Sequence, residues 1–496
     1  MPWPFGDEQQ KEIENIIIRG ARTAATLEDI IQLETGDWKK SEQLHWMDVG
    51  ERYYRNKTDI LERKRTAIGP SGAKEVVGNL ANNKLVNAFV RKLVDQKVGY
   101  LLGKPLSIQT ENKQYANALK GIFNEAMNRR LQSTGKEAVN KGRAWWFVHN
   151  DETGKLCFRK MRSQEIIPLW ADEAHTILDA VIRDYEVTVY EGLKRKKLRK
   201  IEWWDKSGVR RYVLDGTGLV PDVEAGSVES HFTVINKSTD EEEPRNWERV
   251  PFICWKYNEE EQPLVEIIKS LADDYDRNKS DNSNNLEDLP DSIYEVAEYD
   301  GTDPGEFRKN LSVWRTAFVS NGGGIKAINL EINTEAYKIH MEQARKDIYE
   351  FGRGVDTQGV DIGSAPSGIA LKFLYSDLDL DASLMEIEFQ ASLEQVRWFI
   401  DTYLLISTGI DYSTDHVQFI CNRDMPVDES AIITAIKDSV GILSDETLVA
   451  QHPWVRDVLA ELKRIKKQKE EALKRMADGY GGIPPSKDPD KDGDDE

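Results

Sequence analysis

The most constraining feature of the sequence is a change of hydrophobic period in the middle of the chain. Residues 143–257 hold a series of short runs rich in β-branched and aromatic residues, separated by turn residues. Strands at such spacing form an antiparallel sheet or sandwich. On either side of this block, apolar residues return at helical spacing, as in 82–105 and 263–285. The pattern predicts an α+β chain with a β-rich region between helical regions.

The helical regions have recognisable ends. Gly103 and Pro105 stop the helix predicted at 82–105, and Pro263 suits the first turn of the next one. We also expect helices within 8–66 and at 114–142, 333–352, 369–407, 428–439 and 445–476, and a strand at 416–422.

A small α/β insert is predicted between the helices at 263–285 and 333–352. It comprises a helix at 303–314 and two strands joined by a turn at Asn321–Gly324, which is the strongest hairpin signal in the chain. The tail from 477 is acidic and of low complexity, so we expect it to be disordered.

Composition limits the classes of function. The 496 residues include 67 basic and 87 acidic ones, a formal charge of −20, and are enough for two to four structural units. This charge argues against a general grip on nucleic acid, although a protein can enclose DNA without holding it.

The sequence also bears on the compartment. Three scattered cysteines with no CxxC suit a reducing compartment. We expect no signal peptide, because the N-terminus lacks a basic region and a long apolar core. We expect no membrane span, because no apolar run reaches ~18 residues.

A glycine-rich segment, "GRGVDTQGVDIGSAPSG" (352–368), invites comparison with a phosphate-binding loop. A P-loop has Lys and Ser or Thr after its last glycine, whereas Ile369 and Ala370 follow Gly368 here. The dinucleotide fingerprint would need glycine at 357, which is Thr, and a strand before the loop. We therefore interpret the segment as a flexible link between two helices.

The remaining candidates for chemistry are weak. Asp377, Asp379, Asp381 and Glu388 have calcium-loop spacing, but Ala382 replaces the glycine of the sharp turn, so a carboxylate-bearing helix face is favoured. The basic run 194–200, "KRKKLRK", is best explained as a solvated strand edge rather than a phosphate contact. The pairs Trp145–Trp146 and Trp203–Trp204 could stack on bases, but adjacent strand residues point to opposite faces, so each pair should place one residue in the core and one at a surface or interface. No nucleophile or metal motif is found, so we expect no cofactor, no metal site and no catalytic residue.

Four stretches together resemble the portal (head–tail connector) family of tailed bacteriophages, in its siphovirus branch from Gram-positive hosts. They occur in the family's order, and the resemblance covers most of residues 40–470: "VRKLVDQKVGYLLGKPLSI" (90–108), "RVPFICWKYNEEEQPLVEIIKSLADDYDRNKSDNSNNLED" (249–288), "GSAPSGIALKFLYSDLD" (363–379) and "HVQFICNRDMPVDES" (416–430).

The resemblance implies a ring of about twelve subunits at one capsid vertex, through which double-stranded DNA is packaged and ejected. It implies a virion location, with assembly in the host cytoplasm and no membrane. The implied partners are the terminase large subunit, a head-completion (adaptor) protein, and the major capsid and scaffolding proteins.

The resemblance also implies a phage-portal architecture: a helical and β-rich wing, a two-helix stem, a small α/β clip, a long helix and a helical crown. The implied divisions are a wing at 1–262, stem helices at 263–285 and 333–352, a clip at 286–332, a tunnel loop at 353–367, a long wing helix and strand at 368–420, a crown at 421–476 and a tail at 477–496.

Three groups of site residues follow from that placement. The channel constriction would be Arg353, Gly354, Val355, Asp356, Thr357, Gln358, Gly359, Val360 and Asp361. Channel-facing stem candidates are Asp273, Asp274, Asp276, Lys279 and Asp281, whose carboxylates would repel phosphates. The clip interface would involve Asn321, Gly322, Gly323, Gly324, Ile325 and Ala327.

Two other function classes remain open from the sequence. One is a nucleic-acid-processing enzyme that uses clustered carboxylates and magnesium, which would also need a basic groove. The other is a sugar- or peptide-binding β-sandwich, which does not explain two long helices flanking a small insert.

Overall fold

The computed structural model describes residues 26–480, apart from gaps at 69–71, 79, 217, 236–240, 288–291, 300–302, 310–318, 330–333, 359–372, 424–428 and 456–457. The chain divides into two compact units. The first comprises residues up to 360 together with 375–424, and the second comprises 361–374 together with 425–496.

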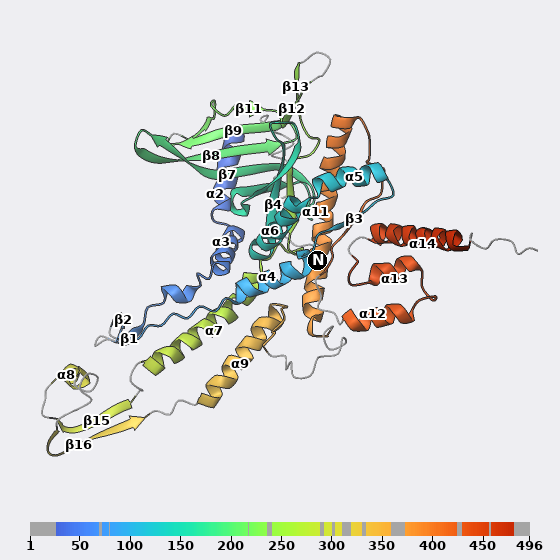
Figure 1. The fold of residues 1–496 in the computed structure, drawn as a ribbon. Helices are drawn as coiled ribbons and strands as arrows, with labels where there is room; N and C mark the ends of the chain where they lie inside the picture. The colour runs from blue at the N-terminus through green and yellow to red at the C-terminus, as the bar shows by residue number, and fades with distance from the viewer. Residues whose placement is uncertain are drawn as a thin grey trace, which may run out of the picture. The chain divides into compact units, whose positions relative to one another are not determined.

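The N-terminal part of the first unit is helical (Figure 1). Thr26 caps the first helix through a capping box with Asp29, in which each side chain accepts a backbone N–H of the other residue. The elements in order are α2 (Leu27–Trp38), α3 (Glu42–Tyr54), η2 (Asp59–Glu62), β1 (Thr66–Ile68), β2 (Lys74–Val76), α4 (Phe89–Leu102), β3 (Ser107–Gln109), α5 (Lys113–Ile122) and α6 (Glu125–Lys141).

Two of the predicted helices differ from the structure. The helix expected at 82–105 begins only at Phe89, and residues 82–88 before it belong to no helix or strand. The helix expected at 114–142 is two helices, since Asn124 is extended and its side chain caps α6 by accepting from Ala126 and Met127 N–H.

The β-rich region forms two antiparallel sheets and a ribbon. A six-stranded sheet has the order β10-β9-β8-β7-β6, with β11 also paired to β9, and a three-stranded sheet has the order β14-β4-β5. The strands are β4 (Arg143–Asn150), β5 (Leu156–Met161), β6 (Ile166–Trp170), β7 (Leu178–Glu191), β8 (Lys194–Asp205), β9 (Gly208–Asp215), β10 (Gly218–Pro221), β11 (Val228–Glu229), β12 (Phe232–Ile235), β13 (Glu242–Arg245) and β14 (Phe252–Lys256), with the short helix η3 (Ser163–Glu165) before β6. β12 and β13 make the ribbon.

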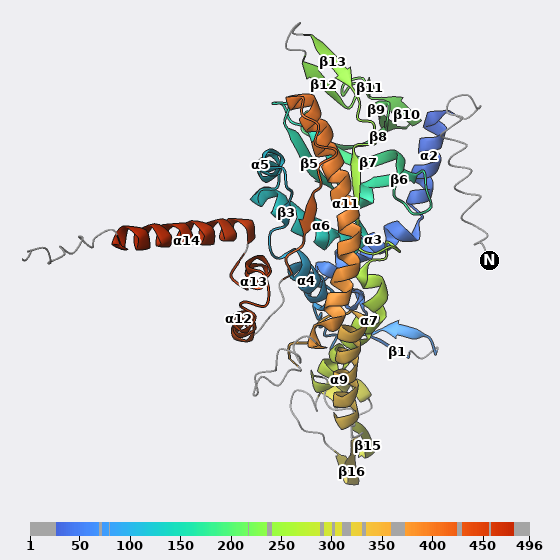
Figure 2. The same ribbon diagram turned by 90° about the vertical axis from the view of Figure 1, so that its right-hand side faces the viewer.

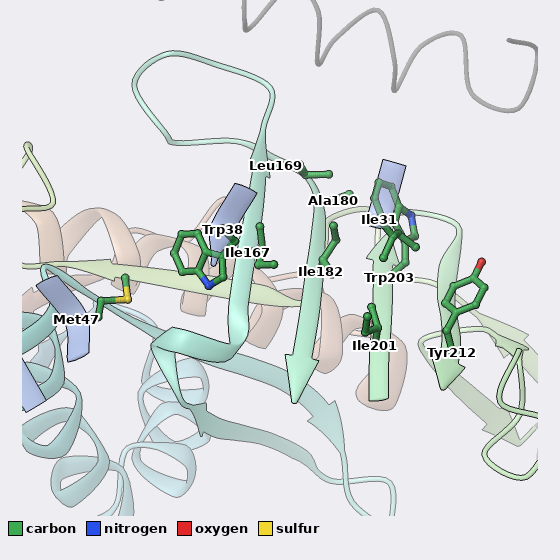
Figure 3. Close-up of a cluster of buried hydrophobic side chains, with 10 residues drawn as sticks. All are labelled: Ile31, Trp38, Met47, Ile167, Leu169, Ala180, Ile182, Ile201, Trp203 and Tyr212. Atoms are coloured by element: carbon green, nitrogen blue, oxygen red, sulfur yellow. The ribbon is translucent and has the colours of Figure 1, made fainter. Parts of the chain in front are cut away.

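Both faces of the six-stranded sheet are covered by buried side chains. Trp203 belongs to the cluster that α2 covers, while its neighbour Trp204 belongs to a second cluster with Trp145 and Phe252. The prediction that one tryptophan of each pair lies at a surface is therefore wrong, because alternate residues of β8 enter two different cores. Figure 3 shows the first cluster: Ile31, Trp38, Met47, Ile167, Leu169, Ala180, Ile182, Ile201, Trp203 and Tyr212.

Long helices complete the first unit. α7 (Leu264–Glu287) and α9 (Thr334–Phe351) pack together, and between them in sequence lie β15 (Ser292–Tyr299), α8 (Pro304–Lys309) and β16 (Val319–Asn329). α11 (Ser376–Thr408) is one continuous helix that packs against β14 and α4 (Figure 2). Gly409, with φ of 76°, ends it in a left-handed cap, and β17 (Gln418–Ile420) then pairs with β3.

The insert differs from its prediction. Asn321–Gly324 is not a turn: β16 continues through it and pairs antiparallel with β15, which the sequence pattern had not indicated. The register shifts between Ala297, opposite Gly324, and Tyr299, opposite Val319, so the glycines lie at a bulge. Gly322 has a φ of 93° there.

Three helices are described in the second unit. They are α12 (Glu429–Asp438), α13 (Asp445–Gln451) and α14 (Val458–Tyr480), and α13 packs against both of the others. The single helix predicted at 445–476 is thus two, since the chain leaves helical geometry at His452, which is extended. Of the predicted tail, residues 481–496 lie outside the described part of the chain.

Candidate functional site

The central feature of the first unit is the pair of long helices α7 and α9. Phe89, at the start of α4, lies against both, with its ring 4.9 Å from that of Tyr275 and 6.0 Å from that of Tyr349. His340 Nε2 on α9 is 3.3 Å from Asp274 Oδ2 on α7. The ring of Phe89 therefore joins α4 to both helices, and the contact between His340 and Asp274 links the two helices to each other.

A column of polar side chains on α7 binds the segment before α4. Alternate N–H groups of that segment donate to acceptors four residues apart: Asn83 to Asn284 Oδ1 (2.6 Å), Leu85 to Ser280 Oγ (2.9 Å) and Asn87 to Asp276 Oδ1 (2.9 Å). Four helical residues rise ~6 Å, so every second residue of the segment meets the next turn of α7. These bonds to α7 take the place of helical hydrogen bonds for residues 83–87, although their apolar residues have helical spacing.

Asp276 is buried within the subunit, with 1% of its surface exposed, which contradicts its place among the channel-facing candidates. Its side chain is within the subunit, where Oδ1 also accepts from Asn87 Nδ2 (2.8 Å) and Oδ2 accepts from Thr58 Oγ1 (2.9 Å). Burial raises the pKa of the Asp276 carboxyl, although these donors partly offset it. The residue holds the fold together rather than presenting charge to a ligand.

The other stem candidates make varied contacts. Tyr53 Oη donates to Asp273 at 2.5 Å, and Lys269 Nζ is 2.6 Å from the same carboxylate. Lys279 donates to Asn87 Oδ1 at 2.8 Å, and Asp281 pairs with Arg63 at 2.8 Å. Asp274 and Asp281 keep about two-fifths of their side chains exposed, at 43% and 41%.

The exposed face of α9 carries charges that the sequence interpretation missed. It alternates in sign, with three acidic and two basic side chains: Glu335, Lys338, Glu342, Lys346 and Glu350. The signal was available as charged residues at spacings of three and four along a helix. On α7, the exposed Arg277 lies between Asp274 and Asp281 at the same spacing. Both exposed faces therefore mix the two signs of charge.

The residues after α9 are anchored on α4. The Gln96 side chain forms two hydrogen bonds with the Val355 backbone, donating to its carbonyl (2.8 Å) and accepting from its N–H (3.3 Å). Arg345 holds Asp356 through two bonds of 2.6 and 2.7 Å. This ion pair lowers the pKa of Asp356. Val355 is buried.

The rest of the predicted constriction is only partly described. Thr357 and Gln358 are exposed, and residues 359–361 lie outside the described residues.

Gly354 is not the source of flexibility that the sequence suggested. A Cβ built on it would lie 2.1 Å from Leu93 Cδ2, and one on Gly352 would lie 2.7 Å from Leu93 Cδ1. The Gly354 N–H also donates to the Tyr349 carbonyl at 2.8 Å. These glycines are required because the backbone passes closely over the side chain of a core leucine.

A buried ion pair lies beside this anchor. Lys97 Nζ is 2.7 Å from Asp381 Oδ2 and donates to the Arg353 carbonyl at 3.3 Å, and Tyr257 Oη donates to the same carboxylate at 2.9 Å. Burial lowers the pKa of Lys97. Asp381 thus joins α4, α11 and the loop before α7.

The calcium-loop spacing has no metal-binding geometry. Asp377, Asp379, Asp381 and Glu388 all lie in α11, where Asp379 instead pairs with Arg423 and accepts from Tyr100 Oη. Within the described residues, no group of three or more His, Cys, Asp or Glu side chains is placed to hold a metal ion.

The basic run 194–200 is largely neutralised. It lies on β8. The first residues of this strand, 194–198, pair with β7 but not with β9, so this end of β8 is a sheet edge as predicted. Acidic residues on β7 and before β11 face it: Lys196 is 3.2 Å from Glu191, Lys197 is 2.6 Å from Glu186, Lys200 is 2.6 Å from Asp222, and Arg199 pairs with Asp184.

Sequence comparison decides the family. The model of the phage portal protein family, SPP1 Gp6-like, matches residues 38–475. The chain belongs to this portal family. It is accordingly a structural subunit of a phage portal vertex, and the family is a non-enzymatic one.

Two curated portal proteins are similar to this one along nearly their whole length. The portal protein of Bacillus phage SPP1 is 28% identical over 487 residues, covering 97% of this chain and 93% of its own. The portal protein of Clostridium phage phiCD119 is 28% identical over 447 residues, covering 87% and 94%.

Among solved structures, matches include two necks of gene transfer agent particles. The neck of an empty particle, computed with C6 symmetry, is 12% identical with a TM-score of 0.39, and covers 73% of this chain and 88% of its own. The neck of a native particle, computed with C12 symmetry, is also 12% identical, has a TM-score of 0.38 and covers 74% and 90%. The portal assignment rests on the sequence matches. In the described part of the chain, no helix has the length and apolar character to cross a membrane.

Proposed function

We propose that this portal subunit forms a closed homo-oligomeric ring of about twelve copies around a channel for double-stranded DNA. The observation that carries the proposal is the family match over residues 38–475, which includes every long helix described above. Contacts in such a ring are head-to-tail, because a two-fold dimer cannot surround a duplex. DNA enters during packaging and leaves during ejection through the same opening.

In this proposal α7 and α9 are the stem. Their exposed faces mix acidic and basic side chains, including Asp274, Arg277 and Asp281 on α7. A face with nearly balanced charge offers phosphates no continuous positive track, so DNA can slide without a strong salt-dependent grip. This replaces the strongly acidic stem face that the sequence suggested, because Asp273 and Asp276 bind groups of their own subunit.

Residues 353–367 are the proposed tunnel loop, and its first residues are its fixed base. The anchoring of Val355 on Gln96 and of Asp356 on Arg345 makes this base an extension of the stem. Any movement of the loop would then leave Val355 and Asp356 in place.

The remaining parts have proposed partners. The clip, built on β15 and β16, contacts neighbouring subunits and docks the terminase large subunit and then the head-completion protein. Gly322, Gly324 and Ile325 on β16 are suited to this because they are exposed in the subunit. The wing would meet the major capsid and scaffolding proteins, and the crown comprises α12 to α14. The subunit would assemble in the host cytoplasm and remain in the virion.

Mass photometry and negative-stain microscopy of the purified full-length protein test the ring. The expected species has about twelve subunits and a central hole. Only monomers and dimers across physiological salt concentrations would overturn the proposal. Nothing supports the alternative of a magnesium-dependent enzyme acting on nucleic acid.

A further inference from the structure

The second unit carries a second basic run, nearly as dense as the one on β8 but in a different setting. Residues 463–469 of α14, "KRIKKQK", contain five cationic side chains in seven positions, and all five are exposed. On β8, by contrast, cross-strand acidic residues face the lysines. The two runs are alike in sequence and differ in how much charge the fold leaves available.

The cations of α14 are arranged on a defined face. Lys463, Lys466 and Lys467 recur at spacings of three and four residues, so they lie on one side of the helix. Leu462 and Ile465 are partly buried, in the helix that packs on α13. The packing of α14 therefore leaves the lysine face uncovered by α13.

Few acidic groups neutralise this face. Arg464 pairs with Glu461 at 3.1 Å and Lys469 with Asp445 at 3.0 Å, while Lys467 lies 3.9 Å from Glu471. No described residue forms an ion pair with Lys463 or Lys466. Lys463 and Lys466 therefore leave two exposed positive charges on one helix face of a chain whose formal charge is −20.

We propose that the lysine face of α14, formed by Lys463, Lys466 and Lys467, binds the phosphate backbone of duplex DNA. The inference deepens the proposed function, since it assumes that DNA passes through or collects beside this ring. Lysine ammonium groups along one helix face supply point charges for phosphates without reading bases. Binding should therefore be independent of sequence and should weaken steeply with salt, because each contact releases condensed counterions.

The test compares two double variants of the full-length protein that remove equal charge. Lys463→Gln with Lys466→Gln removes two lysines from the proposed face. Lys196→Gln with Lys197→Gln removes two lysines that already pair with Glu191 and Glu186. Fluorescence anisotropy with a labelled 30-base-pair duplex, titrated from 50 to 200 mM salt, gives the affinity and its salt dependence for each.

The expected result is a loss confined to the α14 variant. Its slope of log affinity against log salt should be shallower by about 1.8, at about 0.9 per phosphate contact, and its affinity at 100 mM salt should fall at least tenfold. The β8 variant should keep the wild-type slope. Equal slopes in all three proteins, or no binding by the wild type at 50 mM salt, would overturn the proposal.

Two further measurements separate this inference from the ring itself. Mass photometry of the same samples reports ring formation, so a ring that does not bind DNA contradicts only the role of α14. Polyglutamate, which stands in for an acidic protein partner, is tested as a competitor of the labelled duplex. Competition by polyglutamate as effective as that by unlabelled duplex, at equal charge, would assign the face to such a partner and overturn the proposal.

Discussion

Two glycine-bearing segments of the first unit look alike in sequence and differ in the structure. At Gly352–Gly354 the backbone lies against the side chain of Leu93, which leaves no room for a Cβ. At Gly322–Gly324, in β16, a Cβ would meet no atom within 4 Å at either end. The first segment is held by side chains of α4 and α9, whereas in the second Gly324 pairs through its main chain with Ala297 of β15.

The difference shows that a glycine count does not by itself indicate flexibility. Gly354 is a close-approach glycine in an anchored base, whereas Gly322 supplies a positive φ at a bulge. Substitutions in the two segments should therefore have very different effects on stability, and the following predictions test this from the largest expected effect to the smallest.

Gly354→Val should lower the free energy of unfolding by about 3 kcal/mol, because the new side chain overlaps the buried Leu93 side chain. Thermal unfolding and hydrogen exchange of α4 measure the loss. The companion change Leu93→Val shortens the obstructing side chain, so the double variant should be more stable than the sum of the two single effects. A Gly354→Val protein as stable as the wild type would show that the base is not packed as described.

Gln96→Leu replaces the side chain by one of similar size and removes both of its hydrogen bonds to Val355, so it should weaken the attachment of residues 353–356 to α4. We expect a loss of about 1–2 kcal/mol and faster hydrogen exchange at residues 353–358. Gln96→Glu is the matched control, since it keeps the acceptor for the Val355 N–H and loses only the donor. An unchanged exchange rate in Gln96→Leu would mean that packing alone fixes the base.

Asp356→Asn should cost about 1 kcal/mol at pH 7 by removing the ion pair with Arg345. The folded-state pKa of Asp356 is lowered, so its contribution is present above the unfolded pKa of about 3.9 and is lost as pH falls through the folded value. The stability difference between wild type and variant should shrink below about pH 4. Arg345→Lys keeps the charge and should retain part of the effect; a difference that does not vary with pH would contradict the assignment.

Gly324→Ala should change stability by less than about 0.5 kcal/mol, because a methyl group there meets no atom. Gly322→Ala, two residues away, should cost about 1 kcal/mol through its φ of 93°. Thermal unfolding and ring formation are the measurements. Loss of the ring in Gly324→Ala with normal stability would support the proposed contact of this part of β16 with a neighbouring subunit, whereas a loss of stability above about 1 kcal/mol would contradict the open space around Gly324.

The sequence predicted many elements well because their signals are local. The helix expected at 263–285 is α7, and that at 333–352 is α9, each with bounds within two residues of the prediction. The strands around Trp145, Trp203 and Trp255 were expected from their β-branched and aromatic content. The candidate site was harder to predict from the sequence. Five charged positions on α7 could be named, but the sequence did not show which face of the helix each one occupies.

What the sequence determined by itself is the order and type of the elements, the overall charge and the family, because propensity, period and motif are written in neighbouring residues. Only the tertiary structure decided which charges are available. Asp276 and Lys97 are buried in contacts with residues about two hundred or more positions away, and the lysines of β8 are neutralised across a hairpin. The physical reason is that burial and ion pairing depend on which surfaces meet, and a helix such as α7 presents its residues to several neighbours at once.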